Sequence, residues 1–189
     1  MNVLSVEDLV ACLQRDEAVL LPTDTVPALA IRPPAASRIW DLKQRPADKP
    51  LILMGADLEQ LQQALAAPWK TEWLEEAQRV WPGAVTLVLP MAGPFCEALH
   101  PGGANLGLRV PACPMTQELL HNAGPLATTS VNRSGEAPAL DAGQASLLFP
   151  ELSLLGPVPW PAGSGCPSEV RAWSQDGWHV LRSPSPPTP

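Results

Sequence analysis

The sequence predicts a single domain of the α/β or α+β class with a mixed sheet, on the strength of three observations. The chain has 189 residues, of which 46% are hydrophobic, so one sizeable core is expected. Segments with helical periodicity alternate in clusters with short apolar runs that read as strands. Neither an internal repeat nor a linker divides the body of the chain. We therefore expect one domain over residues 1–182, followed by a proline-rich disordered tail, SPSPPTP, over 183–189.

The N-terminal third predicts a helix, a strand and a second helix. Leucine and valine side chains recur at helical spacing over residues 5–15, and Ser5 is a suitable N-cap. The apolar run 18–21 then predicts a buried strand. A further helix is expected over 35–42, and Pro46 marks its end.

The middle of the chain predicts a strand over 51–54 and two helices after it. Asp57 and Gln60 have the spacing of a capping box for a helix over 57–66. Amphipathic periodicity continues in a helix over 70–80.

Two strands and a helix are expected next. ValThrLeuValLeu, residues 85–89, lies between proline- and glycine-containing segments, as a strand would. Residues 106–110 alternate, with leucine and valine on one face and Arg109 on the other. Pro114 occupies a favourable first-turn position for a helix over 114–122.

The C-terminal part predicts a strand over 126–131, a short helix over 141–149 and a hairpin. The hairpin strands are residues 169–173 and 178–182, which flank a Ser-Gln-Asp-Gly turn.

Composition excludes several function classes. The formal net charge is −7, from 12 basic and 19 acidic residues, so weak or no direct nucleic-acid binding is expected, because each neutralised phosphate needs a cation. The four cysteines lack CxxC spacing, which favours free thiols and predicts no metal site. The N-terminus is acidic where a signal peptide is basic, and apolar runs stay below about 18 residues, so we expect no membrane span and a cytoplasmic protein.

Basic residues concentrate in LKQRPADKP. Pro46 disfavours a helical conformation at Arg45, so Lys43 and Arg45 can face the same side of an extended segment and hold one phosphate. Alternatively, the two cations lie at a solvated helix end and complement its dipole.

A second polar element, ATTSVNRSG, follows a predicted strand. Ser130 and Asn132 are two residues apart, so at an extended strand end both project to one side and can hold phosphate or ribose oxygens. The alternative is turn chemistry around Gly135. Arg109 faces either solvent or a carboxylate in a cleft, whereas Ser168 and Arg182 are weaker candidates.

These elements occur in a specific order: PTDTV, LKQRPADKPLIL, WPGAVTLVLP, LGLRVP, TTSVNRSGEAP and PSEV. In this order they resemble the YrdC-like threonylcarbamoyl-AMP synthase family, in its short single-domain bacterial form. The family signature, KxR followed by SxN, corresponds to Lys43-Gln44-Arg45 and Ser130-Val131-Asn132. The resemblance implies an α/β fold with a twisted open mixed sheet and flanking helices around a positively lined cavity.

The resemblance also implies an activity. The family joins L-threonine, bicarbonate and ATP into threonylcarbamoyl-AMP and pyrophosphate, for threonylcarbamoyladenosine at tRNA position 37. ATP is thus expected as a substrate that carries Mg²⁺, and a transfer complex is expected as the partner that takes the product to tRNA. The alternative is a non-catalytic RNA- or nucleotide-binding relative.

By the same resemblance, Lys43 and Arg45 are the catalytic cations. Nucleotide contacts are implied for Lys43, Arg45, Asn105, Ser130, Asn132 and Arg182. Threonine contacts are implied for Thr23, Arg109 and Ser168. Where relatives follow PTDTV with an aromatic residue and glycine, this chain has Pro27 and Ala28. The change is expected to alter one wall of the threonine pocket and to disfavour a positive φ there.

Overall fold

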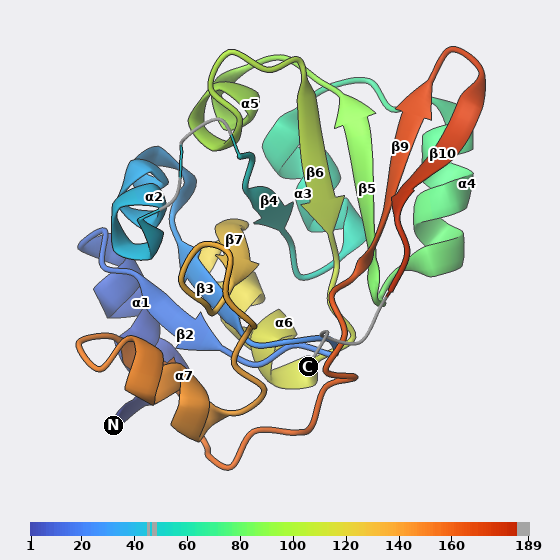
Figure 1. Cartoon of the computed structure of the whole chain (residues 1–189). Coiled ribbons are helices and arrows are strands. Elements are labelled where there is room, and N and C mark those ends of the chain that lie inside the picture. The colour runs from blue at the N-terminus through green and yellow to red at the C-terminus, as the bar shows by residue number, and fades with distance from the viewer. Residues whose placement is uncertain (45, 47–48, 185–189) are drawn as a thin grey trace.

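The computed structural model describes residues 1–44, 46 and 49–184. Within them, ten strands form one sheet in the order β1-β8-β2-β3-β7-β4-β6-β5-β9-β10 (Figure 1). The strands are β1 (Asn2–Leu4), β2 (Val19–Leu21), β3 (Ala28–Ile31), β4 (Ile52–Met54), β5 (Val85–Pro90), β6 (Asn105–Arg109), β7 (Leu126–Ser130), β8 (Ser153–Leu155), β9 (Glu169–Ser174) and β10 (Gly177–Arg182). The helices are α1 (Val6–Gln14), the 3₁₀ turn η1 (Pro33–Ala35), α2 (Ser37–Lys43), α3 (Leu58–Leu65), α4 (Thr71–Val80), α5 (Pro94–Leu99), α6 (Pro114–Ala123) and α7 (Ala142–Leu148).

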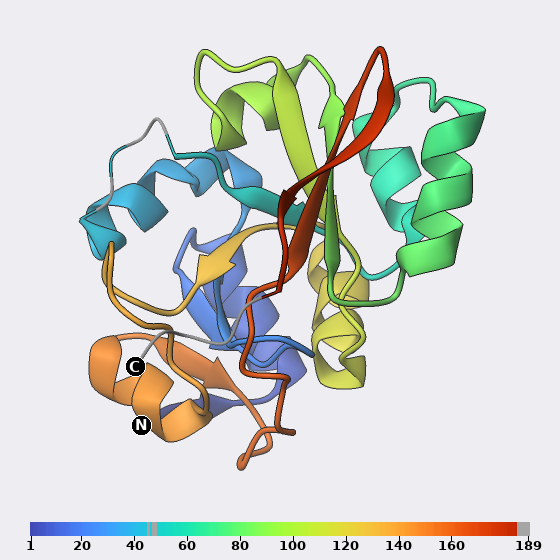
Figure 2. The same ribbon diagram turned by 45° about the vertical axis from the view of Figure 1, so that its right-hand side comes forward.

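The sheet is mixed, as the sequence predicted. β4 runs parallel to β6 and β5 runs parallel to β9, whereas β7 is antiparallel to both of its neighbours, β3 and β4. β2 and β3 form an antiparallel hairpin, so the PTDTVP segment is the connection at its tip. The twist of the sheet and the helices on its flanks are visible when the molecule is turned (Figure 2).

Every helix and strand predicted from the sequence is present within two residues of its expected ends. Two predicted caps are also present: Ser5 accepts from the amide of Asp8 at 3.2 Å, and Asp57 accepts from the amide of Gln60 at 2.7 Å. Strands β1, β3 and β8 and helix α5 were not predicted. They have three to six residues, which is too short for a period of 2 or 3.6 to become visible.

Alternating side chains separate two cores along β2 and β3. Leu20 and Leu29 belong to a large cluster that also contains Ile39 and Trp40 of α2. Their neighbours Val19 and Leu21 point the other way and pack in a second cluster with α1 and α6. Each strand in this part of the sheet is therefore covered on both faces, and its position is fixed from both sides.

Two other expectations can be compared with the structure. The four cysteines are free thiols, as predicted. Along the described parts of the chain, no helix has the length and apolar character needed to cross a membrane. Residues 185–189, most of the expected tail, lie outside the described residues, so the domain and tail boundaries stay predictions.

Leu108 allows the packing of the sheet to be tested. Its side chain is fully buried in the large cluster, so Leu108→Ala should lower the free energy of unfolding by about 2 to 5 kcal/mol. Leu147 on α7 is 83% exposed, and Leu147→Ala should change the same quantity by less than about 0.5 kcal/mol. Urea unfolding of both variants measures the difference, and equal losses would contradict the assignment of the core.

Candidate functional site

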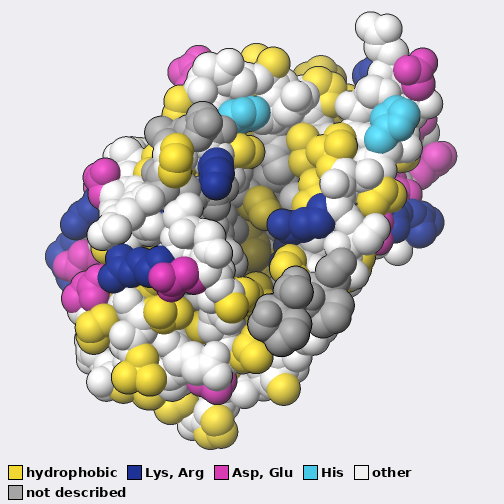
Figure 3. Space-filling view, viewed as in Figure 1, with side chains coloured by type: hydrophobic (Ala, Val, Ile, Leu, Met, Phe, Trp, Pro, Cys, Tyr) yellow, Lys and Arg dark blue, Asp and Glu magenta, His cyan; other side chains and the backbone are white. Residues whose placement is uncertain are grey.

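A cavity of about 680 Å³ opens on one face of the sheet (Figure 3). Its lining comes from β3 to β7, β9, β10 and the loops beside them. The lining includes Lys49, Arg109 and Arg182, together with the carboxylate of Glu136. The cavity thus gathers side chains from most of the chain onto one surface of the sheet.

Strand β6 forms the floor of the cavity. Asn105, Gly107 and Arg109 line it, while Leu106 and Leu108 point into the core behind. Because a strand rises about 3.3 Å per residue, Asn105 and Arg109 mark two ends roughly 13 Å apart. Gly107 lies between these ends and leaves the floor open, because it has no side chain.

The β2–β3 connection binds Arg109 at one end of the cavity. Arg109 Nη2 donates to Asp24 Oδ1 at 2.7 Å, and Nη1 donates to Thr25 Oγ1 at 2.8 Å. The Nε of the same residue is 3.3 Å from the carbonyl of Gly83. Burial lowers the pKa of the Arg109 guanidinium, and the Asp24 carboxylate acts in the opposite direction.

These contacts leave Arg109 two unused donors. A guanidinium carries five N–H groups, and the three bonds above use Nε–H and one hydrogen on each terminal nitrogen. One N–H therefore remains on each of Nη1 and Nη2. Each of these donors can bond to a carboxylate oxygen.

The hydroxyl of Thr23 organises the turn itself. It donates to the carbonyl of Val26 at 2.7 Å, accepts from the amide of Thr25 at 3.0 Å and lies 2.9 Å from Thr25 Oγ1. Because the Thr23 hydroxyl donates its hydrogen to the Val26 carbonyl, the Thr25 hydroxyl must be the donor in the bond between the two threonines. The hydroxyl then has its single donor and both lone pairs occupied. A ligand bond to this hydroxyl would require one of the three bonds to open.

The loop before β9 closes over the same turn. The amide of Ser164 donates to the carbonyl of Asp24 at 3.0 Å, and the amide of Gly165 donates to the carbonyl of Thr25 at the same distance. A Cβ added at Gly163 would lie 2.3 Å from the Thr25 carbonyl oxygen. Only glycine permits this approach, so the loop holds the Thr23–Thr25 turn from its outer side.

Residues of the KxR and SxN elements meet at another part of the cavity wall. Lys43 is 2% exposed, and its ammonium donates to the carbonyl of Ser130 and to Asn132 Oδ1, the latter at 2.6 Å. Ser130 Oγ donates to the same Oδ1 at 2.7 Å, and the Asn132 amide donates to the carbonyl of Glu136. Ser130 and Asn132 line the cavity and Lys43 lies behind them. Arg45 lies outside the described residues.

The C-terminal end of α2 is bound by the same loop. Arg133 donates to the carbonyl of Leu42, and its guanidinium lies 4.7 Å from the centre of the Phe149 ring. The amide of Ser134 donates to the backbone carbonyl of Lys43. Gln44 has a φ of 50°, so the helix ends at Lys43 in a left-handed cap, ahead of Pro46.

Ser168 and Arg182 lie together near the Arg109 end. The guanidinium of Arg182 donates twice to the carbonyl of Ser168, at 2.9 and 3.1 Å. Ser168 Oγ is 2.9 Å from Thr86 Oγ1. These hydroxyls and Arg182 all line the cavity.

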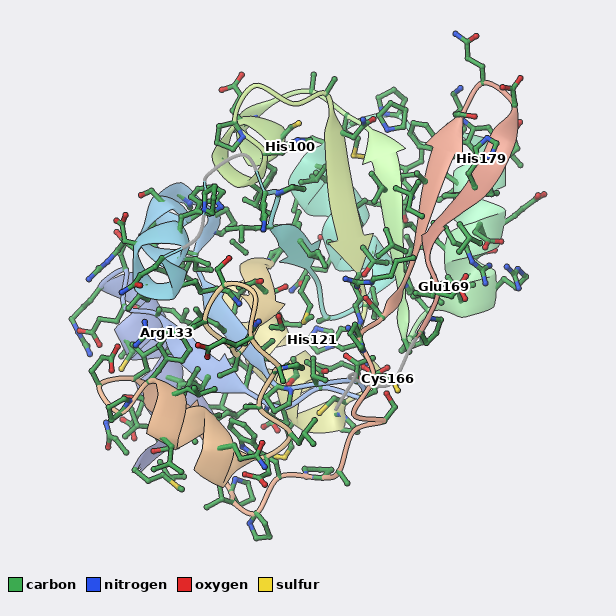
Figure 4. All side chains as sticks on the ribbon, viewed as in Figure 1. His100, His121, Arg133, Cys166, Glu169 and His179 are labelled. Carbon is green, nitrogen blue, oxygen red and sulfur yellow. The ribbon has the colours of Figure 1, made fainter. Side chains whose placement is uncertain are left out.

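Sequence reasoning missed several lining residues. In the sequence, Lys49 is a third cation near the KxR element and Thr86 is a polar residue within an apolar strand. Neither pattern by itself indicates a cavity. His100 carried no local signal. Figure 4 shows His100, His121 and His179 well apart from one another. Of the three, His100 lines the cavity.

The Pro27–Ala28 step has a regular backbone. Ala28 is the first residue of β3, pairs with Ser130, and is not among the described residues with positive φ. Alanine therefore fits this backbone without the strain that the sequence suggested. Both Pro27 and Ala28 line the cavity, so their small side chains leave space there.

The Sua5/YciO/YrdC family model, described as telomere recombination, matches residues 11–183. The chain belongs to this family. It is 34% identical over 155 residues to threonylcarbamoyl-AMP synthase of Chromohalobacter salexigens, covering 77% of this chain and 80% of that protein. It is 38% identical over 135 residues to the synthase of Bacillus subtilis, covering 67% of this chain but only 38% of that protein. The chain thus spans well under two thirds of the Bacillus relative.

Solved structures of this family have the same fold. P. abyssi Sua5 complexed with L-threonine has a TM-score of 0.87 and 26% identity, covering 97% of this chain and 58% of that chain. E. coli YciO has a TM-score of 0.82 and 20% identity, covering 98% and 96%. These matches confirm the expected family and its twisted mixed sheet. The positive lining of the cavity stays a prediction, because Arg109 is paired with Asp24 and Glu136 adds a carboxylate.

Replacing Asp24 tests how much its ion pair with Arg109 contributes to stability. Asp24→Ala should lower the free energy of unfolding by about 3 kcal/mol, because it leaves a buried guanidinium without its carboxylate. Asp24→Asn keeps an oxygen acceptor and should lose less. Asp41 on α2 is exposed, so Asp41→Ala serves as the control. Urea unfolding that finds Asp24→Ala as stable as the control would disprove the role of the pair.

Proposed function

We propose that the chain is an L-threonylcarbamoyl-AMP synthase, which condenses L-threonine, bicarbonate and ATP into threonylcarbamoyl-AMP and pyrophosphate. The observation that carries the proposal is the guanidinium of Arg109, buried at one end of a polar cavity with two N–H groups left for a carboxylate. The relatives named threonylcarbamoyl-AMP synthase, which match most of this chain, support it. The product would serve threonylcarbamoyladenosine formation at tRNA position 37.

The Arg109 end suits the amino acid. Its two free N–H groups would bind the threonine carboxylate, and the nearby hydroxyl of Ser168 would contact the substrate. Thr23 holds the turn that orients Arg109, and its hydroxyl would contact threonine once one of its three hydrogen bonds opens. P. abyssi Sua5, which has the same fold, has been solved with L-threonine.

The remaining polar lining suits the nucleotide. Asn105, Ser130, Asn132 and Arg182 would contact ATP from the cavity wall. Lys43 would act from behind Asn132, whose oxygen it holds, and Arg45 would supply the second charge of the KxR element. Mg²⁺ would arrive on the phosphates, since the described residues contain no cluster of three or more metal-binding side chains. The ion would offset phosphate charge.

The chemistry requires cations in this cavity. The threonine amine attacks bicarbonate, which loses water and gives an N-carboxylate. An oxygen of that carboxylate then attacks the α-phosphorus of ATP, and the bond to the β-phosphate breaks with pyrophosphate leaving. Both reactants are anions, so positioning and positive charge supply most of the catalysis. We propose that a transfer complex, in the cytoplasm, then takes the labile adenylate to tRNA.

The direct experiment incubates the purified chain with ATP, L-threonine, bicarbonate and Mg²⁺. Pyrophosphate and threonylcarbamoyl-AMP, the latter identified by mass spectrometry, are expected only when threonine is present. Absence of the adenylate where a control synthase makes it would refute the proposal. Pyrophosphate release that requires a different amino acid would indicate another adenylating enzyme.

Lys43 and Arg45 give the prediction for the nucleotide side. Lys43→Ala and Arg45→Ala should each lower kcat/KM for ATP about 10- to 100-fold, the loss expected for one charge-assisted contact. Lys70 is an exposed lysine at the start of α4, so Lys70→Ala should leave kcat/KM unchanged. Circular dichroism checks that Lys43→Ala still folds. Full activity in both cation variants would exclude the KxR element from the reaction.

Arg109 gives the matching prediction for the amino acid side. Arg109→Lys keeps the charge but loses the planar fork, so KM for threonine should rise at least about tenfold. KM for ATP should change much less, because the fork faces the amino acid. Steady-state pyrophosphate release, with each substrate varied in turn, measures both constants. Equal increases in the two KM values would argue against a carboxylate at Arg109.

A further inference from the structure

A histidine stands at the end of the cavity opposite Arg109. His100 follows α5, lines the cavity with Asn105 and Lys49, and is half-buried. The amide of Leu51 donates to the carbonyl of Leu99 at 2.8 Å, which holds the segment of Lys49 beside that of His100. In Figure 3 a histidine and a basic side chain lie on the rim of the hollow, and Figure 4 labels the histidine as His100.

The ring of His100 is fixed in one orientation. Nδ1 lies 2.8 Å from the carbonyl oxygen of Asn105, and a carbonyl only accepts, so Nδ1 carries the hydrogen. The backbone turn that follows is closed by a bond from the amide of Gly103 to the carbonyl of His100. A Cβ at Gly103 would lie 2.2 Å from Nδ1, so glycine is what lets the ring lie against the turn.

This orientation leaves Nε2 for a ligand. Within the described residues, neither His100 Nε2 nor the ammonium of Lys49 has a hydrogen-bond partner. Lys49 is exposed and Asn105 is exposed, in contrast to Arg109 at the closed end. The ammonium of Lys49 attracts an anion that extends outward from the reaction centre, and Nε2 can donate to that anion when both ring nitrogens of His100 carry a hydrogen.

We propose that His100 binds the terminal phosphates of ATP, and the pyrophosphate product, through Nε2. The inference rests on the proposed function for the identity of the nucleotide. With the amino acid at Arg109, the α-phosphate lies over the floor near Gly107, and the β- and γ-phosphates reach the rim about 13 Å from Arg109. In the doubly protonated ring Nε2 also donates, so this nitrogen can donate to a phosphate oxygen.

Two substitutions separate ligand binding from support of the turn. His100→Asn places an amide nitrogen where Nδ1 was, so it retains the bond to Asn105 and loses Nε2. His100→Gln reaches the position of Nε2 and loses the bond to Asn105. His121 on α6 does not line the cavity, so His121→Asn is the matched control.

Binding of pyrophosphate, ATP and AMP to the full-length chain is measured by calorimetry without threonine. For His100→Asn, affinity for pyrophosphate and ATP should fall about tenfold, while AMP affinity stays within twofold of the wild-type value. His100→Gln should retain most of the pyrophosphate affinity. The His121→Asn control should bind all three as the unsubstituted chain does.

The opposite pattern would overturn the inference. Unchanged pyrophosphate binding in His100→Asn, or an equal loss of AMP binding, would show that Nε2 does not contact the terminal phosphates. A loss in His100→Gln alone would assign His100 to the turn instead. The proposed function fails separately: phosphate binding that depends on His100 without adenylate synthesis would refute the synthase, and synthesis with normal pyrophosphate binding by His100→Asn would refute only this inference.

Discussion

The buried guanidinium of Arg109 is the constraint on which the cavity depends. A charge removed from water must be paired, and Asp24 and Thr25 on the β2–β3 connection provide the pairing. Because Arg109 ends β6 and β6 lies four strands from β2 in the sheet order, this contact joins two distant strands at one end of the cavity. The same contact leaves one N–H group on each terminal nitrogen of Arg109 for a ligand.

Lys43 is a second buried charge that needs polar partners, and it lies behind another part of the cavity wall. Its ammonium is almost fully buried, so it requires oxygen partners, and it finds them in Ser130 and Asn132. The Ser130–Asn132 segment is thereby fixed to the end of α2. Two polar elements separated by 87 residues thus become one wall, and the charge of Lys43 lies directly behind the groups that line it.

Glycine sets the shape of the cavity at three points. Gly107 leaves the floor open, Gly163 lets a loop approach the Thr23–Thr25 turn, and Gly103 accommodates the ring of His100. At Gly103 and Gly163 an added Cβ would meet other atoms at less than 3 Å. The site is therefore shaped by missing side chains as well as by polar ones.

The sequence by itself determined the elements that have a local cause. Caps at Ser5 and Asp57, the alternation around Arg109 and the signal of Pro46 act within a few residues, so they fixed most helices and strands. The order of motifs also indicated the family and most of the candidate site. Only the tertiary structure decided that Arg109 pairs with Asp24, that Lys43 is buried and that His100 and Lys49 share a rim. Those facts arise from strand order and from contacts across long sequence separations, which no local pattern encodes.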